Sequence, residues 1–133
     1  MNKSLLILTQ YFLPEMGAPQ SRLYELAKNL LDFGWRIEVL TALPNYPTGK
    51  IFKGYERKKV LIEEINGIKA YRTWIYPTKS ANILKRLLCY FSFVLSSIYF
   101  GRKIKDKPNL IYLESPPLFL GYSALYLSNF WKI

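Results

Sequence analysis

The stretch that most constrains this chain is residues 5–41, where two apolar runs flank a loop and a helical pattern. Leu5–Leu8 are apolar without alternation, which is typical of a strand covered on both faces. Apolar side chains then recur at helical spacing over positions 23–31, Gly34 ends that pattern, and Ile37–Thr41 predicts a second strand. A strand, helix and strand this short predict a right-handed βαβ unit and therefore a parallel α/β sheet.

The loop between the first strand and the first helix is a candidate anion site. In open parallel sheets ligands lie beyond the carboxyl ends of the strands, where the first helix aims its N-terminal N–H groups. Gly17 and Ala18 carry almost no side chain, so a phosphate can approach the backbone, and Pro19 suits a first helical turn. A plain turn at Gly17 explains the same residues, because the loop matches neither GxGxxG nor a Walker A motif.

Composition bounds the chemistry. The 133 residues suffice for one core, so we expect one domain or a piece of one. The sequence contains no histidine, which excludes His-based triads and HExxH zinc sites within this chain. Its single cysteine, Cys89, excludes a disulfide framework.

The charge balance predicts anionic partners. With 19 Lys and Arg against 9 Asp and Glu, the net charge is +10, which attracts phosphates on lipids, nucleotides or nucleic acids. No nucleic-acid-binding motif accompanies it, so we expect no nucleic acid as a partner. The first residues lead directly into a strand without a secretory h-region, so we expect a cytoplasmic location.

Residues 42–55 predict a loop at the ligand edge of the sheet, because prolines and glycines interrupt any regular pattern. The candidate substrate contacts in it are Asn45, Tyr46, Pro47 and Gly49. A loop this long is usually functional or mobile, although its lysines also fit simple solvation. Val60–Ile65 and Ile68–Ile75 follow as strands, joined by Asn66-Gly67, a strong signal for a type I′ hairpin.

A long helix is predicted from Ser80, as its cap, to about Lys103, with residues 87–101 nearly all apolar. That run is short for a membrane span, and it fits either a buried helix or one lying in a bilayer interface. Basic residues flank it on both sides and suit anionic headgroups. These candidate membrane-surface residues are Lys85, Arg86, Arg102, Lys103, Lys105 and Lys107.

The last elements predicted are a buried strand over Asn109–Glu114 and a helix from Leu118 to about Phe130. Glu114 and Ser115 then lie at the ligand edge of the sheet. A carboxylate there can bind a hydroxyl or act as a base, and a surface or capping role fits it equally. Because a helix in this position ordinarily feeds another parallel strand, we expect a fragment.

Three segments in this order carry a family resemblance: LILTQYFLPEMGAPQSRLYELAKNLLDFGWRIEVLT, LPNYPTGKIFKGY and ESPPLFLG. Together they resemble the N-terminal domain of GT4-type glycosyltransferases of the GT-B fold, especially bacterial enzymes that assemble O-antigen, capsule or colanic acid. The resemblance covers essentially residues 1–133. Trp35 departs from it, since the family commonly has histidine there.

The resemblance implies a Rossmann-like parallel sheet with helices on both faces and a β-hairpin insertion. It implies transfer of a sugar from a nucleotide sugar to a polyprenyl-diphosphate-linked acceptor at the cytoplasmic face of the plasma membrane, without a metal or other cofactor. Gly17 and Ala18 match the loop that faces the donor diphosphate, and Arg22 lies one turn further on. The donor-binding C-terminal domain lies outside residues 1–133, so we expect this chain alone to be inactive unless another chain supplies that half. A catalytic residue is not assigned. The alternative is a non-catalytic basic module that binds membrane surfaces.

Overall fold

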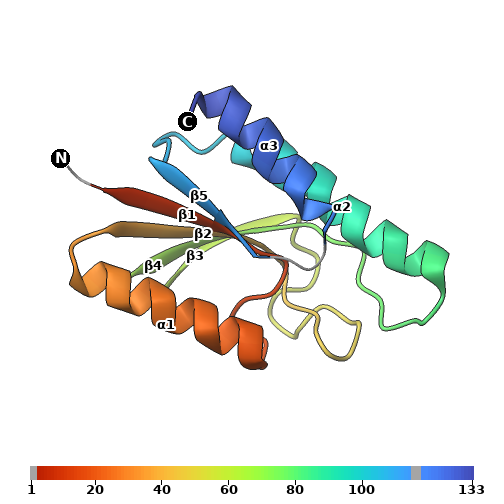
Figure 1. The fold of residues 1–133 in the computed structure, drawn as a ribbon. Coiled ribbons are helices and arrows are strands. Elements are labelled where there is room, and N and C mark those ends of the chain that lie inside the picture. Colours follow the sequence, from red (N-terminus) through yellow and green to blue (C-terminus); the bar gives the residue numbers. More distant parts are fainter. Residues whose placement is uncertain (1–2, 115–117) are drawn as a thin grey trace.

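The structure is a computed structural model that describes residues 3–114 and 118–133. It is an α/β fold built on one five-stranded sheet with helices against it (Figure 1). In chain order the elements are β1 (Ser4–Leu8), α1 (Ala18–Asp32), β2 (Arg36–Ala42), β3 (Val60–Ile65), β4 (Ile68–Thr73), α2 (Ile83–Gly101), β5 (Leu110–Leu113) and α3 (Leu120–Trp131).

The strand order is β3-β4-β2-β1-β5. β1 pairs in parallel with β2 and β5, and β2 pairs in parallel with β4, while β3 runs antiparallel to β4 at one edge. The predicted parallel α/β sheet with a hairpin at one edge is therefore confirmed, and it is consistent with a Rossmann-like fold. β1 lies in the interior of the sheet, which explains why Leu5–Leu8 are all buried.

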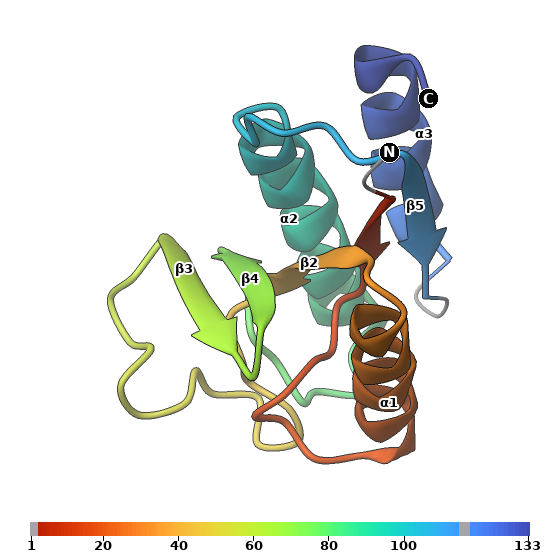
Figure 2. The ribbon, with the colours of Figure 1, turned by 90° about the vertical axis from the view of Figure 1, so that its left-hand side faces the viewer.

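The two faces of the sheet carry separate cores, as Figure 2 shows with α1 on one side and α2 and α3 on the other. Leu5 and Ile7 of β1 pack toward α1, with Leu23 and Ala27 of that helix. Leu6 and Leu8 pack in the opposite direction, into a core with Phe93 of α2 and other residues of α2 and α3. Strands covered on both faces need no polar alternation, so the apolar runs follow from this layering.

The hairpin forms as the sequence predicts. Asn66 and Gly67 both have positive φ, 51° and 89°, which is the signature of a type I′ turn. The register places Ile65 opposite Ile68, so the connection is as tight as a hairpin allows.

The start of α2 differs from the prediction. Asn82 rather than Ser80 caps the helix, since its Oδ1 accepts hydrogen bonds from the backbone N–H groups of Leu84 and Lys85. The Ser80 hydroxyl instead accepts a bond from the N–H of Asn82, two residues on. Both residue types are good caps, and the loop geometry around Ser80 selects the later one.

The serines of α2 dock the helix onto its neighbours. Ser96 Oγ donates to the carbonyl of Trp74 at 2.5 Å, and Ser92 Oγ accepts from the N–H of Tyr76 at 2.8 Å. Ser97 Oγ lies 2.7 Å from Ser123 Oγ of α3 in a buried contact. The polar interruptions of the apolar run therefore fix α2 against the chain after β4 and against α3.

The prediction that Asn109–Glu114 form a fully buried strand is wrong on one face. Leu110 and Tyr112 of β5 are 54% and 40% exposed, whereas Ile111 and Leu113 pack against the α2 and α3 core. β5 is an edge strand of the sheet. Within the described residues, the core beneath α1 includes side chains of β1 and β2 but none of β5, so this face of β5 stays uncovered.

Candidate functional site

A pocket of about 360 Å³ opens at the carboxyl ends of β1 and β2, where ligands bind in parallel α/β sheets. Its walls come from the loop after β1, the loop after β2, the segment before α2 and the first turns of α2. The lining residues are Gln10, Tyr11, Asn45, Tyr46, Pro47, Gly49, Thr78, Lys79, Ser80, Ala81, Arg86, Cys89 and Tyr90.

Gly49 brings two walls of this pocket together. Its φ is +73°, and a Cβ built there would lie 2.5 Å from the backbone nitrogen of Lys79 and 2.9 Å from the carbonyl carbon of Thr78. The loop after β2 therefore packs against the segment before α2 more closely than any side chain permits. The glycine defines the shape of the pocket as well as its own turn.

We expect Gly49→Ala to destabilise the protein by about 1–3 kcal/mol more than Gly54→Ala does, because only the first substitution overpacks backbone against backbone. Gly54 is the matched control, since its φ is +93° and nothing lies within 4 Å of a Cβ there. Urea unfolding of both variants measures the difference. Equal losses would mean that the contact with Lys79 relaxes freely.

Gln10 and Tyr11 form the floor of the pocket. Gln10 is 1% exposed, and its Nε2 donates to the Tyr11 hydroxyl at 3.2 Å and to Cys89 Sγ at 3.7 Å. Burial, together with the neighbouring Tyr90 and Cys89, raises the pKa of Tyr11 above that of an ordinary tyrosine. Tyr11 therefore stays protonated at neutral pH, and because its oxygen accepts from Gln10, its own proton is available for donation.

A smaller hollow of about 230 Å³ lies beside the pocket at the start of α1 and is lined by Gly17 and Ala18 among others. Tyr11 and Tyr46 border both spaces, with their rings edge to face at 5.5 Å between centroids. Gly17 has φ of 167°, which any residue adopts, so a turn does not require the glycine. A Cβ there would lie 2.5 Å from Oε1 of the buried Gln20, so any side chain at this position would require the end of the Gln20 side chain to shift.

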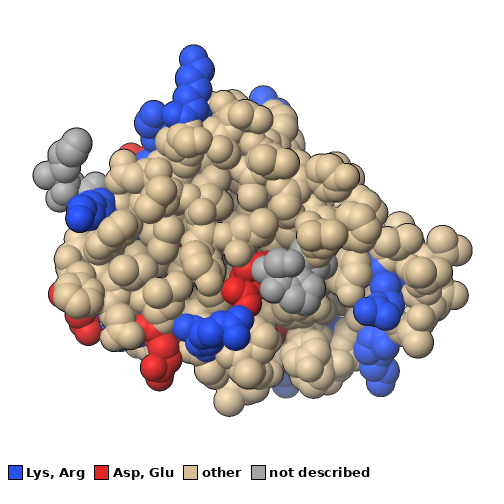
Figure 3. Space-filling view, in the orientation of Figure 1, with Lys and Arg blue, Asp and Glu red and all other residues tan. Residues whose placement is uncertain are grey.

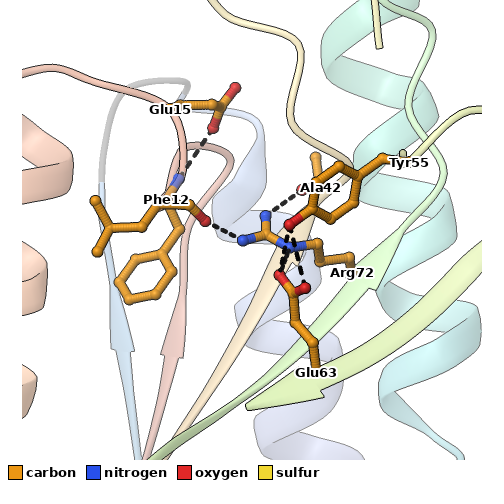
Figure 4. Close-up of polar contacts among 7 residues, drawn as sticks. Phe12, Glu15, Ala42, Tyr55, Glu63 and Arg72 are labelled. Carbon is orange, nitrogen blue, oxygen red and sulfur yellow. Dashed lines mark hydrogen bonds and ion pairs between the residues drawn. The ribbon is translucent and has the colours of Figure 1, made fainter. Parts of the chain in front are cut away.

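A buried carboxylate, Glu15, ties the loop after β1 to the loop after β2. Its Oε2 accepts from the N–H groups of Asn45 and Tyr46 at 3.0 and 2.8 Å. Its Oε1 accepts from the N–H of Phe12 at 3.1 Å (Figure 4). The side chain thus positions Tyr46, which borders both hollows, without itself lining either of them.

We expect the fold to gain stability from Glu15 on mild acidification. Burial raises the pKa of Glu15 above its ordinary value of 4.5, although the backbone N–H groups and Arg72 act against this. As pH falls from neutral through this raised pKa toward 4.5, the folded state binds the proton before the unfolded state does, so stability rises. The free energy of unfolding of the wild type minus that of Glu15→Gln should therefore be larger at pH 5 than at pH 7.5. A difference that shrinks on acidification would contradict this.

Arg72 of β4 is completely buried below the same loops. Its guanidinium donates to the carbonyls of Ala42, at 3.2 Å, and Leu13, and to Glu63 at 2.6 Å. The Tyr55 hydroxyl lies 3.1 and 3.2 Å from the two carboxylate oxygens of Glu63 and completes the group in Figure 4. The Arg72 side chain therefore joins the end of β2 and the middle of β3 to the loop that carries Glu15.

The structure groups only part of the predicted site. Tyr46, Pro47 and Gly49 line the main pocket, while Gly17 and Ala18 line the adjoining hollow. Asn45 also lines the pocket, but it is buried and its amide donates to the Leu43 carbonyl at 2.9 Å, a structural role.

Arg22 and Glu114 form an ion pair with each other, and neither is among the residues that line the two hollows. Glu114 has an 11% exposed side chain, and its carboxylate is engaged by a guanidinium from α1. Ser115 lies outside the described residues.

Several pocket residues were not predicted from the sequence. Gln10, Tyr11, Lys79 and Tyr90 line it, and Arg86, predicted as a membrane-surface residue, lines it too. The position of Gln10 and Tyr11 directly after the first strand is the signal that points to them, because that edge holds the ligand site. Lys79 and Tyr90 carry no comparable signal.

Within residues 3–114 and 118–133, no three His, Cys, Asp or Glu side chains come together in a way that could hold a metal ion. Neither a protein-family model nor a curated protein sequence matches this chain.

Proposed function

We propose that this chain is the acceptor-side domain of a glycosyltransferase that moves a sugar from a nucleotide sugar to a lipid-linked saccharide in surface-polysaccharide assembly. The support comes from the three GT4-like segments of the sequence and from where the first two of them lie. The loop after β1 and the loop after β2 both border the pocket at the carboxyl edge of the sheet. That edge is where open α/β sheets bind their ligands.

The pocket is suited to binding an acceptor rather than to catalysis by itself. Its lining in the described chain offers tyrosines, hydroxyls, Lys79 and Arg86 but no carboxylate that could serve as a base. In the enzymes that the sequence resembles, a second domain holds the donor. We therefore expect that transfer requires that domain, on a longer chain or on a partner.

We expect purified residues 1–133 to transfer no sugar from a panel of nucleotide sugars to a farnesyl diphosphosugar. Thin-layer chromatography of radiolabelled lipid products measures this. The positive control is the same assay with membranes of the source cells, which contain every component. Turnover by the isolated chain would contradict the assignment of the donor site to another domain.

A non-catalytic membrane-surface module is the second candidate, and one observation favours it. α2 and α3 pack side by side and expose many apolar side chains, and the rings of Phe91 and Phe119 lie 4.7 Å apart between centroids. We call this the α2–α3 apolar surface; its exposed members are Leu84, Leu88, Phe91, Leu95, Tyr99, Leu118, Tyr122, Leu125, Tyr126 and Phe130. Among the described residues, α2 is long and apolar enough to cross a membrane, and only 22% of its apolar window is buried.

Basic side chains flank the α2–α3 apolar surface at both ends of α2. Lys85 and Arg86 are exposed in the first turn of α2, and Arg102, Lys103, Lys105 and Lys107 are exposed just after its end. Figure 3 shows the side over α3 as a mostly uncharged area with Lys and Arg at its margins. An apolar patch of this size flanked by bases fits an anionic bilayer surface. Sedimentation with liposomes tests the module, and binding without any role in sugar transfer would favour it over the enzyme.

A further inference from the structure

The edge strand β3 lies within a segment whose charges reverse about its centre. Residues 58–64 read Lys-Lys-Val-Leu-Ile-Glu-Glu, so two cations precede three apolar residues and two anions follow them. Figure 2 shows β3 as the outermost strand on its side of the sheet. An edge strand offers unpaired backbone N–H and C=O groups to any second strand. A segment whose charges reverse about Leu61 is complementary to a second copy of itself laid in the antiparallel direction.

The outward backbone groups of β3 are open for such pairing. Ile65 and Ile68 close a two-residue hairpin, in which the closing pair exchanges hydrogen bonds. Because bonded and non-bonded pairs alternate along an antiparallel ladder, the N–H and C=O groups of Val60, Ile62 and Glu64 point away from β4. Within residues 3–114 and 118–133, the loops make no backbone hydrogen bond to these three residues.

The outward face of β3 is apolar in its middle. Val60 and Ile62 are 42% and 52% exposed. They lie on the α2 side of the sheet, because Ile62 is opposite Tyr71, which belongs to the core beneath α2. The buried residues of that core and the apolar residues packed against them include none from β3, so the two side chains stay uncovered in one copy of the described chain. A second β3 laid beside the first would cover them.

The charged ends of the segment are available to a partner. Lys58 and Glu64 are exposed, and neither forms an ion pair within the part of the chain that the structure describes. Glu64 lies opposite Lys69 of β4, but the Lys69 ammonium lies over an aromatic ring of its own strand. Glu63 differs, because Arg72 already engages its carboxylate. Lys58 and Glu64 are therefore the charges that a second strand meets.

We propose that two copies of this chain associate through their β3 edges, antiparallel about a two-fold axis at Leu61. In this register Val60 of one copy lies opposite Ile62 of the other, and Lys58 lies opposite Glu64. Residues two apart share a face of a strand, so the exposed apolar side chains meet on one side and the outward backbone groups bond to each other. Parallel pairing of the same segments would set lysine beside lysine and glutamate beside glutamate.

A two-fold contact of this kind ends at a dimer. Both copies use the same surface, whereas pairing of β3 with the opposite edge strand, β5, would continue into a filament. The charges that flank β5 are also less available, since Arg22 engages Glu114 and the Lys107 ammonium donates to the carbonyl of Trp131. The dimer does not depend on the proposed function, because no residue of β3 lines the pocket at the carboxyl edge of the sheet.

Sedimentation equilibrium of the 133-residue chain measures this association. We expect a reversible equilibrium between monomer and dimer at protein concentrations up to about 1 mM. Lys58→Glu and Glu64→Lys each place like charges opposite each other twice in the dimer, so each should weaken it about tenfold. The double variant Lys58→Glu/Glu64→Lys restores both pairs and should dimerise as the wild type does. Circular dichroism verifies the fold of each variant.

The two single variants also separate this contact from an effect of net charge. Lys58→Glu lowers the net charge of +10 by two, and Glu64→Lys raises it by two. General repulsion between copies would therefore make the first variant dimerise more strongly than the wild type and the second more weakly. Glu25→Lys, at an exposed position on α1, raises the charge by the same amount and should affect the dimer far less than Glu64→Lys does.

Leu61→Cys tests the register. On the two-fold axis the two copies of residue 61 form a directly opposed pair without mutual hydrogen bonds, which brings side chains closest in an antiparallel ladder. Oxidation with copper phenanthroline should therefore give a disulfide-linked dimer. The wild type, whose single Cys89 is buried, should remain monomeric in denaturing gels. So should Leu110→Cys, which places the thiol at an exposed position of β5.

Any of four results would overturn the proposal. These are a wild type that stays monomeric up to about 1 mM, assembly that grows beyond a dimer, a double charge variant that fails to restore dimerisation, and cross-linking of Leu110→Cys as readily as of Leu61→Cys. Sugar transfer is measured separately, so the failure of either proposal leaves the other intact.

Discussion

Replacing Arg72 by methionine should be among the most destabilising single substitutions in this chain, with an expected loss of about 3–5 kcal/mol. The guanidinium is completely buried and donates to two loop carbonyls and to Glu63. Methionine fills a similar volume but leaves Glu63 and the carbonyls of Ala42 and Leu13 without that donor. The Glu63 side chain is 25% exposed, so solvent recovers part of the loss, which places the expected value toward the lower end.

Arg36→Met is the matched control for this prediction. Arg36 also lies on a strand but is exposed, and its guanidinium reaches the carbonyls of Asp106 and Lys107 only at 3.3 and 3.4 Å. Its replacement should change stability by about 0.5 kcal/mol or less, as is usual for surface sites. Urea unfolding with matched m-values measures both. Similar losses for the two variants would mean that the buried guanidinium contributes no more than a surface one.

The second large effect concerns membrane binding. Changing Arg102, Lys103, Lys105 and Lys107 together to glutamine should weaken binding to vesicles rich in phosphatidylglycerol at least tenfold. Each cation near an anionic surface contributes about 1 kcal/mol to binding. These four residues are exposed beside the C-terminal end of α2, next to the α2–α3 apolar surface.

The control for this experiment removes the same number of charges from another part of the chain. Lys53, Arg57, Lys58 and Lys59 are exposed in the loop before β3, away from α2 and α3, and their change to glutamine should have a much smaller effect. Raising salt from about 0.1 to 1 M should also release the wild type, since the Debye length falls from about 10 to 3 Å. Equal effects of the two quadruple variants would indicate attraction by net charge alone. Retention in carbonate or 1 M salt would indicate that α2 inserts deeply.

The layers of the fold were predictable from local patterns. Leu5–Leu8 and Ile37–Thr41 do not alternate between apolar and polar residues, because both faces of β1 and β2 are covered. The absence of alternation can be read from the sequence, so the burial of both faces could be predicted. The type I′ turn at Asn66-Gly67 could be predicted from these two residues alone, because both readily adopt the positive φ that the turn requires. Two predictions were wrong: the helix cap was placed at Ser80, and β5 was expected to be buried on both faces. The exact start of a helix and the position of a strand at the edge of a sheet depend on neighbouring elements rather than on the segment itself.

The buried polar residues of the site were not predictable in the same way. Glu15 lies in a loop, and its partners Asn45 and Tyr46 lie 30 and 31 positions further along the chain. Arg72 occupies a regular strand position, and its acceptors come from three separate segments. Such contacts arise from the tertiary arrangement of loops, for which the sequence has no periodic signal.

The most direct measurement of the proposed function is sugar transfer to lipid in the cells from which the chain comes. Membranes from cells with and without the gene would be incubated with radiolabelled nucleotide sugars, and label counted in the butanol-extracted lipid. The proposal predicts that deletion abolishes at least one labelled lipid-linked saccharide and that the wild-type gene restores it, whereas a variant with both Arg86→Gln and Lys79→Gln in the pocket restores it poorly. Unchanged lipid labelling after deletion, for every nucleotide sugar that labels the wild-type membranes, would contradict a role in glycosyl transfer.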